Sequence, residues 1–217
     1  MRVVSRVGGM NKNSKRTPGR PREFDLKLAQ SAILDEFWCK GYSATSVDDL
    51  SRATGMVKPS LYSAFGNKYA MYQMAVKIYS EMLVDKFTTA FNEPDNIQDA
   101  LEGLFKVSLD IYCGNNNDAP RGCLFTTTTI AESHNHPEIG EVVREQLALF
   151  DKALEKCLVR LCPDWSADQM KYQSWIIMSS LNHLSTCARL GMERKELDGI
   201  VACLINQIVG SKDLAIA

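Results

Sequence analysis

Apolar residues recur at three- and four-residue intervals through nearly all of the chain that follows residue 22. In the first such segment, from about residue 25 to 40, Leu26, Ala29, Ile33 and Phe37 fall on one face of a helix. Alternation of apolar and polar residues with a period of two, which is typical of a half-buried strand, is scarce. The pattern therefore predicts an all-α fold.

Glycine, proline and asparagine divide this pattern into nine predicted helices. They span about residues 25–40, 45–54, 59–66, 68–91, 97–113, 122–133, 138–162, 167–190 and 194–210. Residues 1–22 lack periodicity and are rich in Lys, Arg, Gly, Ser and Asn, so we interpret them as a flexible basic arm.

Charge is distributed unevenly along the chain. Residues 1–70 carry 12 Lys and Arg against 6 Asp and Glu, whereas the remainder carries 13 basic and 20 acidic residues. This asymmetry favours a polyanionic partner for the first third only. No apolar run is long enough to span a membrane, and the N-terminus lacks a secretory h-region. We therefore expect a cytoplasmic protein with no membrane partner, whose seven cysteines, without a CxxC pair, stay reduced.

Residues 47–65 have the spacing of a helix-turn-helix, with Gly55 at the corner between two short helices. We expect the inward positions to be Val47, Leu50, Ala53, Leu61 and Phe65. The second helix would then present one cation, two hydroxyls and a tyrosine outward, namely Lys58, Ser60, Ser63 and Tyr62. Such a face suits the major groove of DNA, although Lys58 and Tyr62 taken alone, outside this motif, would rather indicate a solvated surface pair.

This segment resembles the TetR family of repressors over about residues 22–79. The matching residues are Gly41-Tyr42, Thr45-Ser46-Val47-Asp48-Asp49-Leu50, Ala53-Thr54-Gly55, Lys58-Pro59-Ser60-Leu61-Tyr62, Phe65 and Asn67-Lys68. The stretch Gly19-Arg20-Pro21-Arg22 is similar to the subgroup with a GRP-type N-terminal arm, and Gly122-Cys123-Leu124 resembles some members. The resemblance implies a nine-helix homodimer with an effector pocket in the C-terminal domain.

The domain organisation that we predict follows from this resemblance and from the helix pattern. Residues 1–22 form the arm, and residues 23–70 form a three-helix helix-turn-helix domain that binds DNA. A connecting helix spans residues 68–91, and residues 92–217 form a helical domain for effector binding and dimerisation.

Ten residues are predicted to contact DNA: Arg20, Arg22, Thr45, Ser46, Lys58, Pro59, Ser60, Tyr62, Ser63 and Lys68. Arg20 and Arg22 either enter a narrow minor groove or belong to a solvated tail. Thr45 and Ser46 are helix caps that can also reach phosphate. Lys68 is at a helix start, where the helix dipole disfavours a cation, so a phosphate contact would explain its presence.

Two positions depart from the family pattern. Val57 stands where a small polar residue often caps the recognition helix, and Ser63 stands where histidine or another aromatic residue is common. Both departures bear on base preference.

A ligand pocket is predicted in the C-terminal half. Four threonines, residues 126–129, form a run that helices disfavour, so their hydroxyls either bond back to the preceding turn or line a cavity. The predicted pocket residues are Phe105, Tyr112, Cys123, Phe125, Thr126, Trp175 and Met178, each of which could instead be plain core. A small, mainly apolar molecule with one polar group would fit such a lining.

Reactive chemistry has few candidates. Cys123 follows Gly122 at a predicted helix start, which could activate the thiol as a sensor, and the alternative is an inert buried cysteine. Together with His134 and His136 it could bind a metal, but no second thiolate lies at ligand spacing, so we predict no metal and no cofactor. No nucleophile motif, phosphate loop or paired carboxylates point to catalysis, so we predict no enzyme activity.

The last two predicted helices carry apolar stripes that could form a four-helix dimer interface. The stripe residues are Ile177, Leu181, Leu184, Ala188, Leu197, Val201, Leu204 and Ile208, and one stripe could instead bury into its own domain.

The sequence thus predicts a homodimeric transcriptional regulator, a repressor that a small-molecule effector releases from a palindromic operator on double-stranded DNA. The rival hypotheses are a helical enzyme or carrier with a vestigial helix-turn-helix, and a regulator switched by thiol modification or metal.

Overall fold

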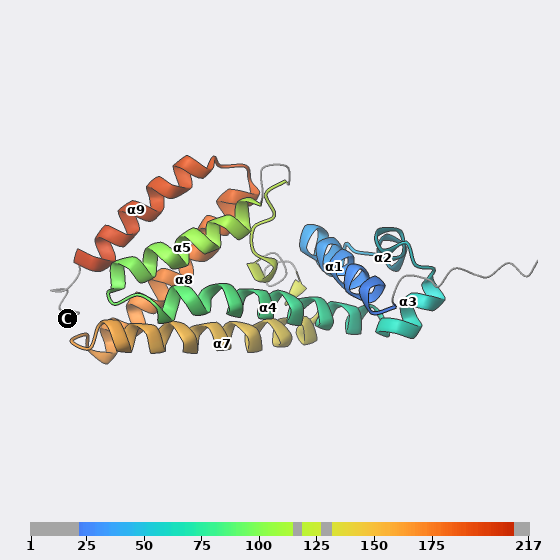
Figure 1. Ribbon diagram of the computed structural model, residues 1–217, viewed down its shortest axis with the longest axis horizontal. Coiled ribbons are helices and arrows are strands. Elements are labelled where there is room, and N and C mark those ends of the chain that lie inside the picture. The colour runs from blue at the N-terminus through green and yellow to red at the C-terminus, as the bar shows by residue number, and fades with distance from the viewer. Residues whose placement is uncertain (1–21, 115–118, 127–131, 211–217) are drawn as a thin grey trace, which may run out of the picture.

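The computed structural model describes residues 22–114, 119–126 and 132–210, and every element within these ranges is helical (Figure 1). The helices are α1 (Arg22–Lys40), α2 (Val47–Thr54), α3 (Lys58–Phe65), α4 (Lys68–Asn92), α5 (Ile97–Cys113), α7 (Pro137–Leu161), α8 (Ala167–Arg189) and α9 (Arg194–Gly210). Residues 124–126 are also helical, two residues after the predicted start at residue 122. The predicted all-α class is confirmed.

The helices form an elongated molecule with α1, α2 and α3 at one end (Figure 1). The long helix α4 begins beside this end and runs through the body, with α7 along it. Helices α5, α8 and α9 complete the body, where α5 contacts α4, α8 and α9. Because α4 contacts α1 as well as α5 and α7, one continuous helix connects the two parts of the fold.

Local capping explains why these helices begin where they do. Ser46 and Asp49 form a reciprocal capping box at α2, and Ser166 and Gln169 form another at α8. The side chain of Asn67 accepts a hydrogen bond from the Ala70 amide and starts α4. Each cap satisfies a backbone amide that the first helical turn leaves without a partner.

Aromatic rings fill the core where α1 meets α4. Phe37 packs edge-to-face on Tyr72 with ring centroids 5.3 Å apart, and Trp38 packs on Tyr79 at 4.8 Å. Tyr79 in turn packs edge-to-face on Phe125, which lies in the short helical segment 124–126. These contacts fix the orientation of α1 relative to the body.

The predicted dimer stripes on α8 and α9 are wrong for most of their members. Six of them lie buried in the core of their own protomer: Ile177, Leu181, Leu184, Ala188, Leu197 and Ile208. Val201 and Leu204 are partly buried against the same core. The predicted stripes therefore stabilise the protomer itself.

Two further burial predictions are wrong. Trp175 was expected to line a pocket, but it is 56% exposed on α8, where its ring meets Tyr172 edge-to-face and the Lys171 ammonium lies over it. Ala53 was expected to face inward on α2, but it is exposed, and Leu50 alone is fully buried on that helix.

All seven cysteines are free thiols. Within the described ranges, no helix has both the length and the apolar character needed to cross a membrane.

Candidate nucleic-acid interface and ligand cavity

The helix-turn-helix is held in shape by hydrogen bonds across its turn. Gly55 ends α2 with a φ of 68°, in the left-handed region that glycine adopts without strain. The Ser51 hydroxyl donates to the Met56 carbonyl at 2.6 Å, and the Met56 amide donates to the Thr54 hydroxyl at 3.2 Å. The turn therefore fixes the direction in which α3 leaves α2.

Helix α3 has one buried side and one open side. Leu61 is fully buried and Phe65 partly buried, whereas Tyr62 is 47% exposed and Pro59, Ser60 and Ser63 are exposed. Val57 occupies the N-cap position and makes no side-chain hydrogen bond there, which leaves amides at the start of α3 uncapped by a side chain. The open side presents hydroxyl groups and one aromatic ring, and such groups can contact base edges when a helix lies in the major groove of DNA.

Lys58, the first residue of α3, forms an ion pair with α2. Its Nζ lies 2.7 Å from Oδ1 of Asp48, and this carboxylate raises the pKa of the Lys58 ammonium. Both side chains remain largely exposed. Lys58 is therefore charged and accessible, and a phosphate that it binds has to share its ammonium with Asp48 or displace that carboxylate.

Thr45 cannot contact DNA in this structure. Its side chain is fully buried, and its hydroxyl donates to the Gly41 carbonyl at 2.7 Å. The structure corrects this prediction, because the hydroxyl anchors the loop between α1 and α2 instead of facing outward. Ser46 is exposed, as a phosphate contact requires, but its hydroxyl already caps α2 through Asp49.

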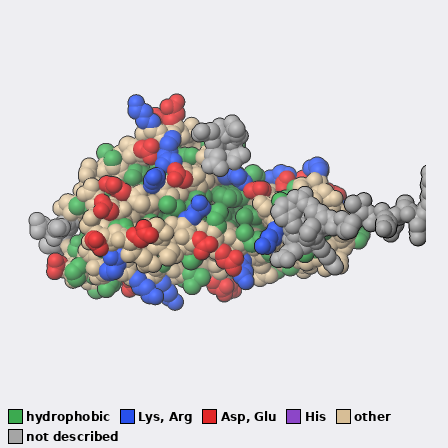
Figure 2. Space-filling view, viewed as in Figure 1, with side chains coloured by type: hydrophobic (Ala, Val, Ile, Leu, Met, Phe, Trp, Pro, Cys, Tyr) green, Lys and Arg blue, Asp and Glu red, His purple; other side chains and the backbone are tan. Residues whose placement is uncertain are grey.

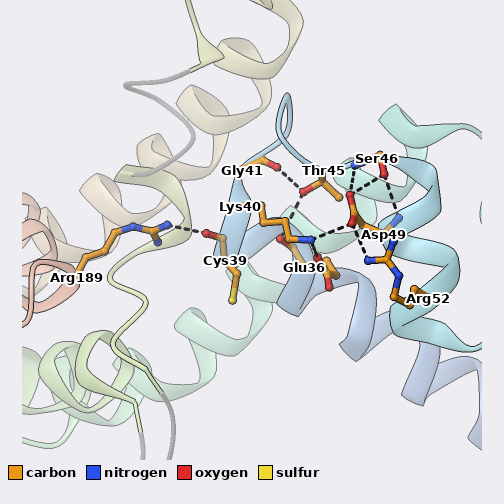
Figure 3. A network of polar contacts seen from close by, with 9 residues as sticks. All are labelled: Glu36, Cys39, Lys40, Gly41, Thr45, Ser46, Asp49, Arg52 and Arg189. Carbon is orange, nitrogen blue, oxygen red and sulfur yellow. Dashed lines mark hydrogen bonds and ion pairs between the residues drawn. The ribbon is translucent and has the colours of Figure 1, made fainter.

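Asp49 joins α1 to α2 (Figure 3). The hydroxyl and backbone amide of Ser46, together with Lys40, hold the pKa of the Asp49 carboxyl well below its usual range. The ammonium of Lys40 lies 2.8 Å from Glu36 and 3.1 Å from Asp49. The cap of α2 is thus tied to the C-terminal turn of α1.

Lys68 is partly buried at the start of α4. Its ammonium lies 4.4 Å from the centroid of the Tyr42 ring, and burial lowers its pKa. A cation–π contact therefore holds Lys68 in the protein itself. This contact gives a second reason for a cation at this helix start, beside the predicted phosphate contact.

The basic character of the first third comes from residues before α1. Residues 22–70 carry six basic and six acidic residues, whereas residues 1–21 carry six basic residues and no acidic one. Arg20 lies outside the described residues, and Arg22 is described only as the first residue of α1, without its side chain. The described helix-turn-helix unit is thus electrically balanced, and on the face in Figure 2 acidic side chains are spread over the body.

Hydrogen bonds connect the C-terminal part of α1 to the body, and we call the region around Trp38, Cys39, Gly122 and Arg189 the junction. The Trp38 indole donates to the Gly122 carbonyl at 2.9 Å. The Arg189 guanidinium on α8 donates to the Cys39 carbonyl at 2.6 Å (Figure 3). Within the body it also donates to the Arg121 carbonyl at 2.7 Å. Gly122 has a φ of 66°, and a Cβ there would lie 2.8 Å from the Ser185 carbonyl oxygen, so the junction requires glycine.

Sequence reasoning missed Asp48, Arg189 and Glu132 as partners at this end of the molecule. Glu132 is buried and accepts a hydrogen bond from the Ser43 amide at 2.7 Å. Its partner is 89 positions away, and the Arg189 contact to Cys39 joins residues 150 positions apart. No local pattern could have revealed either contact.

A cavity of about 530 Å³ lies between α4 and α7. Its walls include Leu83, Phe87, Phe91, Phe125 and Phe150. Of the predicted pocket residues, the structure places only Phe125 in this lining. The volume is in the range of small-molecule sites.

The other predicted pocket residues lie elsewhere. Phe105 and Tyr112 are buried in the core, and Met178 is partly buried against it. Thr126 donates a hydrogen bond to the Asn182 side chain at 3.2 Å, while the remaining threonines of the run, residues 127–129, lie outside the described residues.

The candidate sensor and metal residues have other partners. Cys123 is buried, and its Sγ accepts a hydrogen bond from the Tyr79 hydroxyl at 3.4 Å. His136 lies 3.4 Å from Glu138 and packs against the Tyr42 ring. In the part of the chain that the structure describes, no three His, Cys, Asp or Glu side chains gather in a way that could hold a metal ion.

Comparison with known proteins identifies relatives. A family model described as bacterial regulatory proteins, tetR family, matches residues 31–75, which contain α2 and α3. The HTH-type transcriptional repressor BdcR of Escherichia coli (strain K12) is 39% identical over 189 residues, covering 87% of this chain and 91% of that protein. The HTH-type transcriptional repressor ComR of the same strain is 29% identical over 145 residues, covering 66% of this chain and 68% of that protein.

A solved structure shares the fold. A cysteine mutant of the TetR family transcriptional regulator CifR, complexed with 26bp double-strand operator DNA, superimposes with a TM-score of 0.77 at 22% identity. The match covers 87% of this chain and 98% of the other.

Proposed function

The chain belongs to the TetR family of bacterial transcriptional regulators, and we propose that it binds a near-palindromic operator as a homodimer and leaves it when a small molecule occupies its C-terminal cavity. The observation that carries this proposal is the open side of α3, which presents Ser60, Tyr62 and Ser63 beyond a turn fixed by hydrogen bonds. A rigid short helix with polar groups on one side is what major-groove recognition needs.

The contacts on this side divide into two kinds. Tyr62, Ser60 and Ser63 can reach base edges or a thymine methyl, and these contacts would specify sequence. Lys58 and Lys68 supply cations for phosphates, and these contacts would set position and affinity. Pro59 keeps the first turn of α3 rigid, and Ser46 acts first as the α2 cap.

The faces of α8 and α9 that point away from the core support a dimer. Tyr172, Trp175, Ile176 and Ile200 are exposed there, although large apolar side chains usually avoid water. A groove between the two helices has small residues, Ser179 and Gly199, in its lining. We propose that a second copy packs on this surface and places the two α3 helices about one DNA turn, or a multiple of it, apart.

The α4–α7 cavity supports a mechanism of release. Helix α4 lines the cavity from Ser80 to Asn92 and begins directly after the helix-turn-helix. A ligand that displaces α4 can therefore move α3 relative to its copy in the partner protomer. Release also requires the ligand to bind the DNA-free state more tightly, by several kcal/mol for a shift from mostly bound to mostly free.

A gel-shift assay on the DNA upstream of the protein's own gene tests the proposal. We expect binding that is far tighter than to a scrambled duplex of equal length, and that weakens steeply as salt rises. Equal affinity for both duplexes at every salt concentration would contradict sequence-specific regulation and would favour the rival class, a helical enzyme or carrier with a vestigial helix-turn-helix.

A further inference from the structure

The α4–α7 cavity has an uneven lining. Aromatic and aliphatic side chains, among them Phe87, Phe91 and Phe150, form its apolar walls. The charged residues in the lining are all cations, namely Lys152, Lys156 and Arg160, and no carboxylate belongs to it.

The three cations differ in what they already bind. Arg160 donates to the backbone carbonyls of Phe91 and Pro94, at 2.5 Å and 2.8 Å, and so fastens the end of α4 to α7. Lys152 and Lys156 are exposed, and neither forms an ion pair with another residue in the described part of the chain. They stand four residues apart on α7, where like charges repel each other across one helical turn. An anion between them would remove this repulsion.

A second observation points to a ligand with polar character. The Ser80 hydroxyl on α4 lines the cavity, is shielded from solvent and has no hydrogen-bond partner. A buried hydroxyl without a partner is costly, and a ligand that supplies one would recover that cost.

We infer that this cavity takes an anionic amphipath, with its head group between Lys152 and Lys156 and its apolar chain along Phe87, Phe91 and Phe150. This inference rests on the proposed function, because it assumes that the α4–α7 cavity is the site where the effector binds. Lysine ammonium groups are point charges without a bidentate geometry, so both a carboxylate and a phosphate head can pair with them.

Isothermal titration of the full chain with decanoate, decyl phosphate and decan-1-ol tests the inference. The three probes each have a ten-carbon skeleton, and the two anions distinguish a carboxylate from a phosphate head. We expect at least one anion to bind about tenfold or more tightly than decan-1-ol, a difference that corresponds to about 1.4 kcal/mol. Binding of decan-1-ol as tight as both anions, or no binding of any probe, would overturn the inference.

A double variant, Lys152→Gln with Lys156→Gln, assigns the effect to the cavity. It should lower the affinity for the favoured anion about tenfold and leave decan-1-ol unchanged. Lys86→Gln is the matched control, since Lys86 is an exposed cation on α4 that does not line the cavity. An unchanged anion affinity in the double variant, or an equal loss in the control, would contradict the assignment.

A gel shift without added ligand separates this inference from the proposed function. The double variant should bind upstream DNA as the unmodified chain does, because its substitutions lie far from α3. If the unmodified chain fails to bind DNA, the proposed function is wrong. Whether the cavity binds an anionic amphipath is decided by the calorimetric titration alone.

Discussion

Nζ of Lys58 lies 2.7 Å from Oδ1 of Asp48, so the first residue of the recognition helix α3 is paired with a carboxylate of α2. The pair places a negative charge next to the cation that we expect to meet a phosphate. Asp48 therefore competes with DNA for Lys58 and also repels the phosphate backbone. We therefore expect substitutions of Lys58 and Asp48 to change operator affinity in opposite directions.

Lys58→Ala should weaken operator binding and lower the slope of log affinity against log salt by about one unit, because one phosphate contact releases about one counterion. Asp48→Asn should strengthen binding a few-fold and steepen the same slope. Affinities measured by fluorescence anisotropy at several salt concentrations give both quantities.

Asp168→Asn is the matched control for Asp48→Asn, since Asp168 also lies in the first turn of its helix but belongs to α8. It removes the same charge without touching the DNA-binding end, so its effect on affinity should be much smaller. An equal gain in DNA affinity in both variants would show that the effect comes from net charge, and it would contradict a role for the Lys58–Asp48 ion pair.

Deletion of residues 1–19 should reduce affinity for all DNA sequences, because it removes five of the six cations that precede α1. The described helix-turn-helix unit is electrically balanced, so we expect the salt slope to fall by more than it does in Lys58→Ala.

Adding Arg20→Gln to this deletion tests whether the arm reads a minor groove. If Arg20 enters that groove, the combined variant should lose preference for A·T pairs beside the half-site, and the deletion alone should keep it. Identical sequence preference in both proteins would favour the solvated-tail interpretation.

Sequence reasoning located the helices well because their ends depend on local chemistry. The Ser46 and Ser166 capping boxes and the Asn67 and Asn96 caps are each formed by residues three positions apart. Such signals are present in any short window of sequence. The open side of α3 was predictable for the same reason, since Leu61 and Phe65 define its buried side.

The same reasoning failed where two apolar faces compete. Helix α8 has Ile177 and Leu181 on its buried face, whereas Trp175 and Ile176 lie on its exposed side. Apolar residues occur on both sides, so periodicity alone does not predict which side the protomer buries. Thr45 was placed outward because hydroxyls often cap helices, but its partner is the Gly41 carbonyl. The junction could not be predicted, because Arg189 meets Cys39 only through the tertiary fold.

Trp38→Phe should destabilise the protein by about 1–3 kcal/mol, because it leaves the buried Gly122 carbonyl without its donor. It should also weaken operator binding, since α1 would be held less firmly to the body. Thermal unfolding and anisotropy measure the two effects. Trp165→Phe, between α7 and α8 and away from the junction, should leave operator affinity unchanged, and a similar loss there would contradict the role of the junction.

Ile200→Glu and Ile176→Glu should each raise the dimer dissociation constant by at least about 30-fold, which corresponds to about 2 kcal/mol at the centre of an interface. Light scattering across a concentration series gives the constant. Val159→Glu is the control, because Val159 is also an exposed apolar residue but lies on α7, away from the proposed interface. Monomers of the unmodified chain at micromolar concentration, or dimers unaffected by all three changes, would contradict the proposed interface.

The most direct test of the account is the ratio of operator affinity to scrambled-duplex affinity in Tyr62→Ala. Tyr62 is the large exposed side chain at the centre of α3, so its loss should reduce operator affinity by about 1–3 kcal/mol and leave scrambled-duplex affinity nearly unchanged. Tyr62→Phe shows in addition whether the ring or the hydroxyl is responsible. A ratio that stays the same in Tyr62→Ala would contradict the claim that α3 reads the operator.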